Sequence, residues 1–137
     1  MKRWLQMRFV PMNLDLGLLL LRLAFGLALF LNHGWEKASN FQNVYARFGD
    51  PIGVGGHFSA IFAMTSDAIC SVLIGIGLAT RWAAALIVIN VTVAFLFVHH
   101  AKLHGSGEVP WLYLWAGVLL LLAGAGRYSI DGKPSAN

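Results

Sequence analysis

The sequence predicts an all-α protein, an integral membrane four-helix bundle with a short amphipathic interfacial helix between spans 1 and 2. Its 137 residues are 58% hydrophobic and only 12% charged, whereas soluble domains are about 45–50% apolar and about 25% charged. The apolar residues are also gathered into long runs, and a transmembrane helix needs about 20 such residues. We expect a single membrane domain over residues 1–137, with spans at about 13–32, 57–79, 81–98 and 111–126.

The first expected span, residues 13–32, is an apolar run that carries Arg22 near its centre. A charge at this depth costs about 2.5–3.5 kcal/mol on insertion scales. Arg22 therefore needs a partner inside the protein. The preceding segment, residues 1–12, is basic and interleaved with apolar side chains, and we expect it to be a retained interfacial anchor.

The connection between the first two spans contains a second helical pattern. Phe41, Val44, Tyr45 and Phe48 are spaced i, i+3, i+4, i+7, which is typical of an amphipathic helix. We expect this helix to lie on the membrane surface. The glycine-rich stretch 51–56 that follows is expected to be a flexible loop.

The second and third spans are separated only by Thr80-Arg81-Trp82. A turn this short predicts an antiparallel helical hairpin, with Thr80 as the N-cap of the third span. The fourth span opens with Trp111, Tyr113 and Trp115, where an interfacial aromatic belt is expected.

The charges predict the orientation in the membrane. With both termini on one side, that side carries six basic residues: Lys2, Arg3, Arg8, Arg81, Arg127 and Lys133. The other side carries Lys37, Arg47 and Lys102. The positive-inside rule then favours cytoplasmic termini. It also explains the net charge of +4 without a nucleic-acid partner. The single cysteine, Cys70, excludes a thiol–disulfide exchanger made by this chain alone, and we expect it to be a buried core residue.

Three polar residues are predicted to form a cluster within the membrane: Arg22, Asp67 and Asn90. Counted from the expected cytoplasmic ends of their spans, they lie within roughly 5 Å of one another in depth. Arg22 and Asp67 have opposite charges, so we predict an ion pair between them, with Asn90 as a third member. Two interpretations stay open: the pair locks the order of the helices, or the cluster lines a cavity for a polar headgroup or for protons.

A second group of polar residues is expected in one layer at the outer surface: His33, Glu36, Lys37, His99, His100, His104 and Glu108. His100 and His104 would share a helix face at i, i+4 spacing. No H-E-x-x-H motif and no thiolate accompanies them, so we expect no metal. Interfacial side chains, or a proton-handling rim of a hydrophobic pocket, are the favoured interpretation. Glu36 or Glu108 would serve as a proton acceptor beside a quinone, or simply be solvated.

Several segments in order resemble the DoxX-like family of small integral membrane proteins, the DoxX/DoxD and Surf4-like group. They are 20–26, 33–37, 75–84, Asn90 with 98–99 in the third span, and 124–131, the last reading Gly-Ala-Gly-Arg-Tyr-Ser-Ile-Asp. The resemblance implies a four-helix protein of the bacterial inner membrane, associated with quinol-linked respiratory modules and membrane oxidoreductase complexes. This chain has Asp67 where the family usually has a glutamate.

The resemblance, taken with the polar cluster, implies a small subunit of a quinone-linked membrane redox system. A quinone is the expected cofactor and would lie near Arg22, Asp67 and Asn90. The expected partners are the lipid bilayer, other membrane redox proteins and further copies of the chain. Whether the chain has catalytic activity of its own stays open. The rival interpretation is a non-enzymatic assembly, partner-binding or lipid-carrying module. A cavity between the helices that touches Arg22 or the histidine layer would favour a ligand, and continuous packing would favour a structural role.

Overall fold

The computed structural model describes residues 13–132, and every regular element within that range is a helix. This confirms the predicted helical class. The expected basic anchor, residues 1–12, and Lys133 lie outside the described residues.

The first helix is longer than the sequence pattern indicated. It consists of α2 (Leu14–Leu29), the π-helical turn η1 (Phe30–Gly34) and α3 (Trp35–Ser39). Asn13 caps its start, because the Asn13 Oδ1 atom accepts a hydrogen bond from the backbone N–H of Leu16 at 3.0 Å. The pair His33-Gly34 was expected to lie beyond the helix. The chain instead passes through it as a π-helical turn and stays helical.

The connection to the second helix is compact. α4 (Phe41–Arg47) occupies the position of the predicted amphipathic helix. Its Tyr45 ring stacks on His57 with ring centroids 4.3 Å apart. The loop after it was expected to be flexible, but hydrogen bonds hold it. The Asp50 carboxylate accepts them from the backbone N–H groups of Val54 and Gly55 at 3.0 and 2.9 Å.

The remaining chain forms two further long helices and a shorter one. The second consists of α5 (Gly56–Met64), η2 (Thr65–Cys70) and α6 (Ser71–Ile76); the third of α7 (Thr80–Val93) and η3 (Ala94–Val98); the last is α8 (Glu108–Ala123). The first three helical runs are long and apolar enough to cross a membrane. α8 is apolar but shorter.

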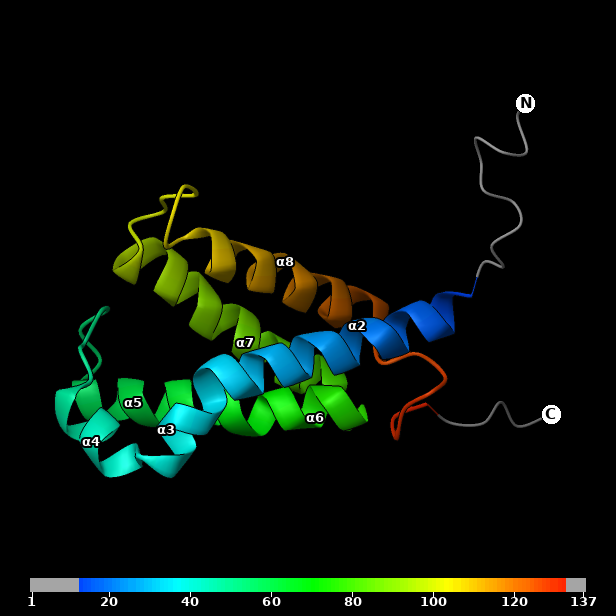
Figure 1. Cartoon of the computed structure of the whole chain (residues 1–137), viewed down its shortest axis with the longest axis horizontal. Coiled ribbons are helices and arrows are strands. Elements are labelled where there is room, and N and C mark those ends of the chain that lie inside the picture. The colour runs from blue at the N-terminus through cyan, green and yellow to red at the C-terminus, as the bar shows by residue number, and fades with distance from the viewer. Residues whose placement is uncertain (1–12, 133–137) are drawn as a thin grey trace.

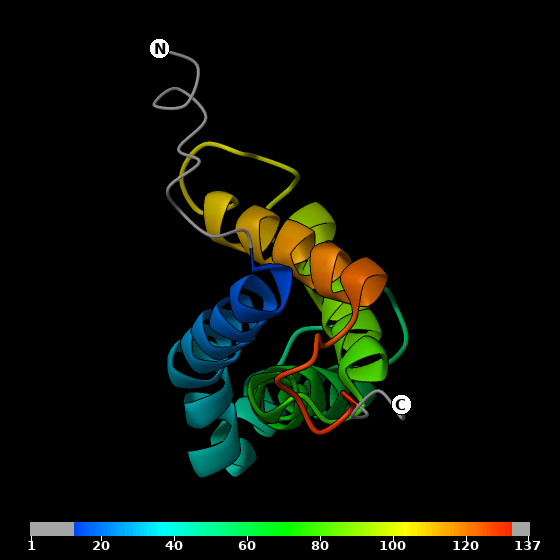
Figure 2. The same ribbon diagram turned by 90° about the vertical axis from the view of Figure 1, so that its right-hand side faces the viewer.

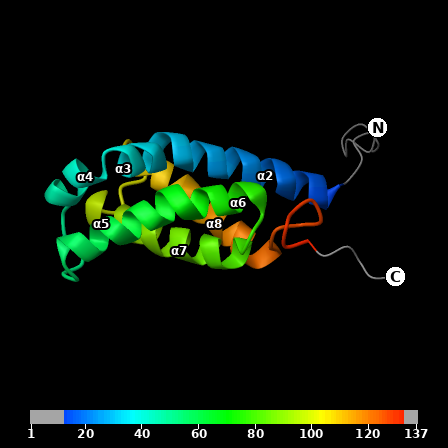
Figure 3. The same cartoon turned by 90° about the horizontal axis from the view of Figure 1, so that it is seen from below.

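The helices lie side by side along one long axis (Figure 1). α2 packs on α6, α6 on α7, α7 on α8, and α8 on α2, and Figure 3 shows α5 and α6 alongside α2. Buried apolar side chains from all four fill the centre, including Phe25, Ile74, Ile87 and Leu120, with the predicted Cys70 among them. Large apolar side chains on the outer faces are exposed, as expected of helices that face lipid.

Two glycines fix the register between the first and second helices. A Cβ atom on Gly26 would clash with the backbone at Ser71, and a Cβ atom on Gly34 would clash with the backbone at Asp67. Small residues allow this close backbone approach in a membrane, where helices associate by packing. Gly34 therefore brings η1 directly against η2.

Candidate functional site

The structure overturns the predicted Arg22–Asp67 ion pair. Arg22 is fully buried, and its guanidinium donates hydrogen bonds to the backbone carbonyls of Ile74 (3.3 Å), Gly75 (3.1 Å) and Tyr128. The first two carbonyls belong to the last turn of α6, where carbonyls lack helical partners. Asp67 lies seven residues earlier, about 10 Å along the helix. The prediction failed because the start of α2 extends about two turns past the end of α6. The prediction measured depth from the ends of both helices as if those ends were level, and it therefore misplaced Arg22.

The C-terminal segment covers the part of α2 that extends past α6, and it binds Arg22 there. In the end-on view of Figure 2, residues 124–132 cross the ends of the helices. Asp15 Oδ1 accepts a hydrogen bond from the backbone N–H of Arg127 at 2.9 Å. Gly77 ends α6 with a positive φ of 75°, and a Cβ atom there would clash with the Arg22 guanidinium and with Ser129. Arg22 therefore has a structural role, joining three parts of the chain.

Asp131 completes this arrangement by capping α7. Its carboxylate accepts hydrogen bonds from the backbone N–H groups of Ala79 (2.8 Å) and Thr80 (2.7 Å). The predicted N-cap was wrong, because Ala79 occupies that position and its side chain makes no capping hydrogen bond. An acceptor from a distant segment supplies the cap, which spacing along the chain does not reveal.

The polar cluster in the centre of the protein is instead built around Asp67. One carboxylate oxygen of Asp67 forms an ion pair with Lys37, and the other accepts a hydrogen bond from Asn90 Nδ2 at 2.9 Å. The Lys37 and Asp67 side chains are 19% and 6% exposed. The predicted Asp67–Asn90 association is therefore correct, and the cation is Lys37.

Lys37 reaches Asp67 because the first helix continues past Asn32. Residues 26, 34 and 37 share one face of that helix, so the face that packs on the second helix also carries Lys37. Continuing the pattern of Gly26 and Gly34 through the next turn is the sequence signal that could have found this contact.

A cavity of about 740 Å³ surrounds the cluster. Its polar lining comes from Asn32, His33, Lys37, Asp67, Asn90, His99, Ser106 and Tyr113. Its apolar lining includes Leu29, Phe48, Val91, Ala94 and Val98. The side chains come from all three long helices, from the start of α8 and from the connection before it, so the cavity lies between the helices toward that end of the bundle.

All three π-helical turns of the described chain contribute to this cavity. η1 provides Asn32 and His33, η2 provides Asp67, and η3 provides Ala94 and Val98. Such turns are rare and often mark functional sites, because the extra residue changes the direction of the side chains that follow. Their convergence on one space distinguishes the cavity from the packed interior around Arg22.

The predicted outer layer divides into two groups. His33, Lys37 and His99 line the cavity, and His33 makes an edge-on contact with Tyr113 at 5.8 Å between ring centroids. The other four are exposed and do not line it: Glu36, His100, His104 and Glu108. His100 and His104 share no helix face, because His100 has a positive φ of 52° and the chain is not helical from 99 to 107. Within residues 13–132, no three metal-ligating side chains gather.

Comparison with known proteins gives one positive finding. No curated protein and no solved structure matches the chain. The family model described as DoxX matches residues 17–100. The matched range contains Arg22, Lys37, Asp67 and Asn90, and it covers the three long apolar helices except for the first three residues of the first one. The chain is a multi-pass membrane protein and belongs to the DoxX family.

Proposed function

We propose that this protein is a four-span bundle of the bacterial inner membrane, with residues 1–137 as one domain and both termini in the cytoplasm. α8 is the fourth span in this proposal, since it packs on both α7 and α2. The imbalance of six basic residues against three between the two sides supports the orientation. The cavity with Lys37 then lies toward the outer side of the membrane.

We further propose that the cavity binds the headgroup of a membrane quinone, and that the protein is a subunit of a quinone-linked redox system. The supporting observation is the Lys37–Asp67–Asn90 cluster inside a cavity of about 740 Å³. Ligand sites commonly have volumes of about 300–1,000 Å³, apolar walls and a few placed polar groups. An ion pair that only locked two helices would need no such space beside it.

The chemistry of the polar side chains fits the two states of a quinone. A quinone carries two electrons and two protons between membrane proteins. The Lys37 ammonium and the Asn90 amide are donors for a ring carbonyl, and the Asp67 carboxylate is an acceptor for a ring hydroxyl. His33 and His99 also line this cavity, and their ring nitrogens can donate or accept hydrogen bonds with the ring oxygens. Electron transfer belongs to a membrane redox partner in this proposal.

The test is quinone binding to the full chain in detergent micelles, with decylubiquinone as the probe. Asp67→Asn and Lys37→Met remove hydrogen bonds to charged groups, each contributing about 1.5–3 kcal/mol. We therefore expect affinity to fall roughly tenfold to a hundredfold. Lys102→Met is the matched control, because Lys102 is exposed and outside the cavity.

Wild-type affinity in folded Asp67→Asn and Lys37→Met variants would contradict this site. A wild-type protein that retains phospholipid but binds no quinone would support the rival lipid-carrying role. Thermal unfolding of each variant, measured alongside, establishes that the protein tested is folded.

A further inference from the structure

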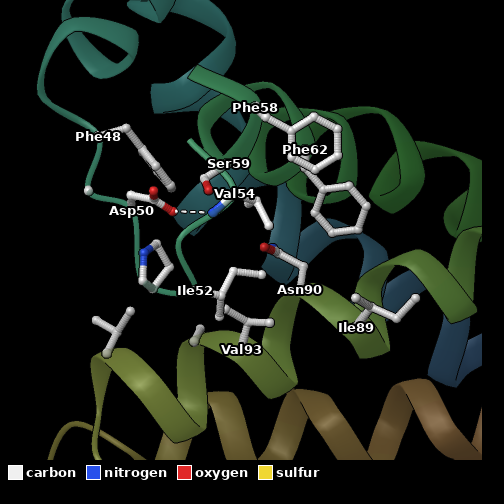
Figure 4. Close-up of a pocket in the computed structure, with 14 residues that line it drawn as sticks. Phe48, Asp50, Ile52, Val54, Phe58, Ser59, Phe62, Ile89, Asn90 and Val93 are labelled. Carbon is white, nitrogen blue, oxygen red and sulfur yellow. Dashed lines mark hydrogen bonds between the residues drawn. The ribbon is translucent and has the colours of Figure 1, made fainter. Parts of the chain in front are cut away.

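A second cavity, of about 540 Å³, lies between α5 and α7 beneath the loop 48–55 (Figure 4). Its walls are almost entirely apolar and include Phe48, Ile52, Phe58, Phe62, Ile89 and Val93. The Asp50 carboxylate holds the loop above it through the backbone N–H groups of Val54 and Gly55. The cavity therefore has an ordered roof.

This apolar cavity adjoins the polar one. Four residues line both: Phe48, Asn90, Ala94 and Val98. Asn90 projects from α7 into the space between α7 and α5 (Figure 4), and its amide donates to Asp67. The two spaces thus meet at a residue that already belongs to the polar cluster.

The apolar cavity also faces outward. Phe58 and Ile89, on its two sides, are 60% and 52% exposed, and apolar side chains exposed on membrane helices face lipid. A molecule in the hydrocarbon region can therefore reach Asn90 between α5 and α7 without passing through water.

One polar atom in this cavity has no partner. The Ser59 hydroxyl is buried without a hydrogen bond, whereas Ser71 and Thr92 each donate to a carbonyl four residues earlier. Leaving a buried hydroxyl unpaired costs about 1–3 kcal/mol. An oxygen-bearing ligand in this space would provide the missing partner.

We propose that the apolar cavity is the membrane entrance and tail site for a quinone whose headgroup binds at Lys37, Asp67 and Asn90. The inference rests on the proposed function and adds the path and the place of the hydrocarbon tail. The outward side admits the molecule from lipid, and the apolar walls hold its tail. Ser59 donates to the ring oxygen nearest the tail.

The experiment compares two probes, decylubiquinone and its ring without the tail, on the full chain in the same micelles. Ile89→Trp fills the apolar cavity, and Leu119→Trp on α8 is its matched control, since the two positions are 52% and 51% exposed and Leu119 lines neither cavity. We expect Ile89→Trp to weaken decylubiquinone at least tenfold and the tail-free ring less than twofold. Leu119→Trp should change neither.

Val93→Trp, on the same wall, provides a second filled variant with the same expected pattern. A photoreactive group at the end of the decyl tail tests the wild-type chain directly. We expect its crosslinks within residues 48–62 and 89–98.

Each outcome separates the two proposals. Crosslinks confined to other segments, or unchanged decylubiquinone affinity in both filled variants, would overturn the tail site while leaving headgroup binding intact. A wild-type protein that binds neither probe would overturn both.

Discussion

Lys37 and Asp67 form an ion pair that joins the end of the first long helix to the π-helical turn of the second. The pair lies in the wall of the central cavity and shares Asp67 with Asn90. Arg22, the one fully buried cation among residues 13–132, is bound by backbone carbonyls nearer the opposite end. The protein thus has two polar centres: Arg22 joins parts of the fold, and the Lys37–Asp67 pair lies beside a cavity.

The coupling between Lys37 and Asp67 can be measured with a double-mutant cycle. Lys37→Met and Asp67→Asn each leave a partly buried partner uncompensated, which costs about 3–5 kcal/mol in buried pairs. We expect each variant to unfold at a lower temperature. The double variant should lose less than the sum, with a coupling of about 0.5–3 kcal/mol. Additive losses would show that the two side chains do not interact.

Gly34 is predicted to be intolerant of even one methyl group. Gly34→Ala places a Cβ atom against the Asp67 backbone, so η1 must move away from η2. We expect lower thermal stability and weaker Lys37–Asp67 coupling in the cycle described above. Gly17→Ala on the same helix is the control, because nothing lies within 4 Å of its Cβ position. That control should be neutral or stabilised by about 0.5–1 kcal/mol.

Arg22 is predicted to stabilise the fold without contributing to ligand binding. Arg22→Lys keeps the charge but cannot reach three carbonyls at once. We expect a loss of at least about 1.5–3 kcal/mol and faster hydrogen exchange in residues 124–132. Arg81→Lys is the control, since Arg81 makes one exposed contact, to the Leu122 carbonyl. Weaker quinone affinity in folded Arg22→Lys protein would contradict this assignment.

Asp131 is predicted to make stability depend on pH in the acidic range. Burial acts to raise the pKa of this carboxyl, but hydrogen bonds from the backbone of Thr80 and Ala79 outweigh it and hold the pKa below its usual value. A carboxyl with a lowered pKa stabilises the folded state above its unfolded pKa, about 3.9. That contribution is lost as the pH falls through the lower folded value.

The corresponding measurement compares thermal unfolding of wild type and Asp131→Ala in micelles from pH 6 to pH 3. Loss of a cap costs about 0.5–2 kcal/mol, so we expect wild type to be more stable by about this amount at pH 6. The difference should shrink below about pH 4. A difference that stays constant with pH would mean that the Asp131 charge does not support α7.

The sequence alone determined the class of the protein, and it identified two of the residues that meet in the central polar cluster. Long apolar runs require helices in lipid, because only helices and closed barrels satisfy backbone polar groups there. The charge of Arg22 within an apolar run indicated that it needs a partner. The similar depth of Asp67 and Asn90 in their spans correctly predicted that these two meet. The resemblance to the DoxX family is confirmed by the match over residues 17–100.

Only the tertiary structure decided which charges meet. Register between α2 and α6 depends on the backbone contacts at Gly26 and Gly34, and the π-helical turns redirect the side chains of His33 and Asp67. Neither feature has a period that can be read from hydrophobicity. Arg22 therefore meets the C-terminal segment, and Lys37 meets Asp67, because helix register and local winding fix depth more strongly than the attraction between opposite charges.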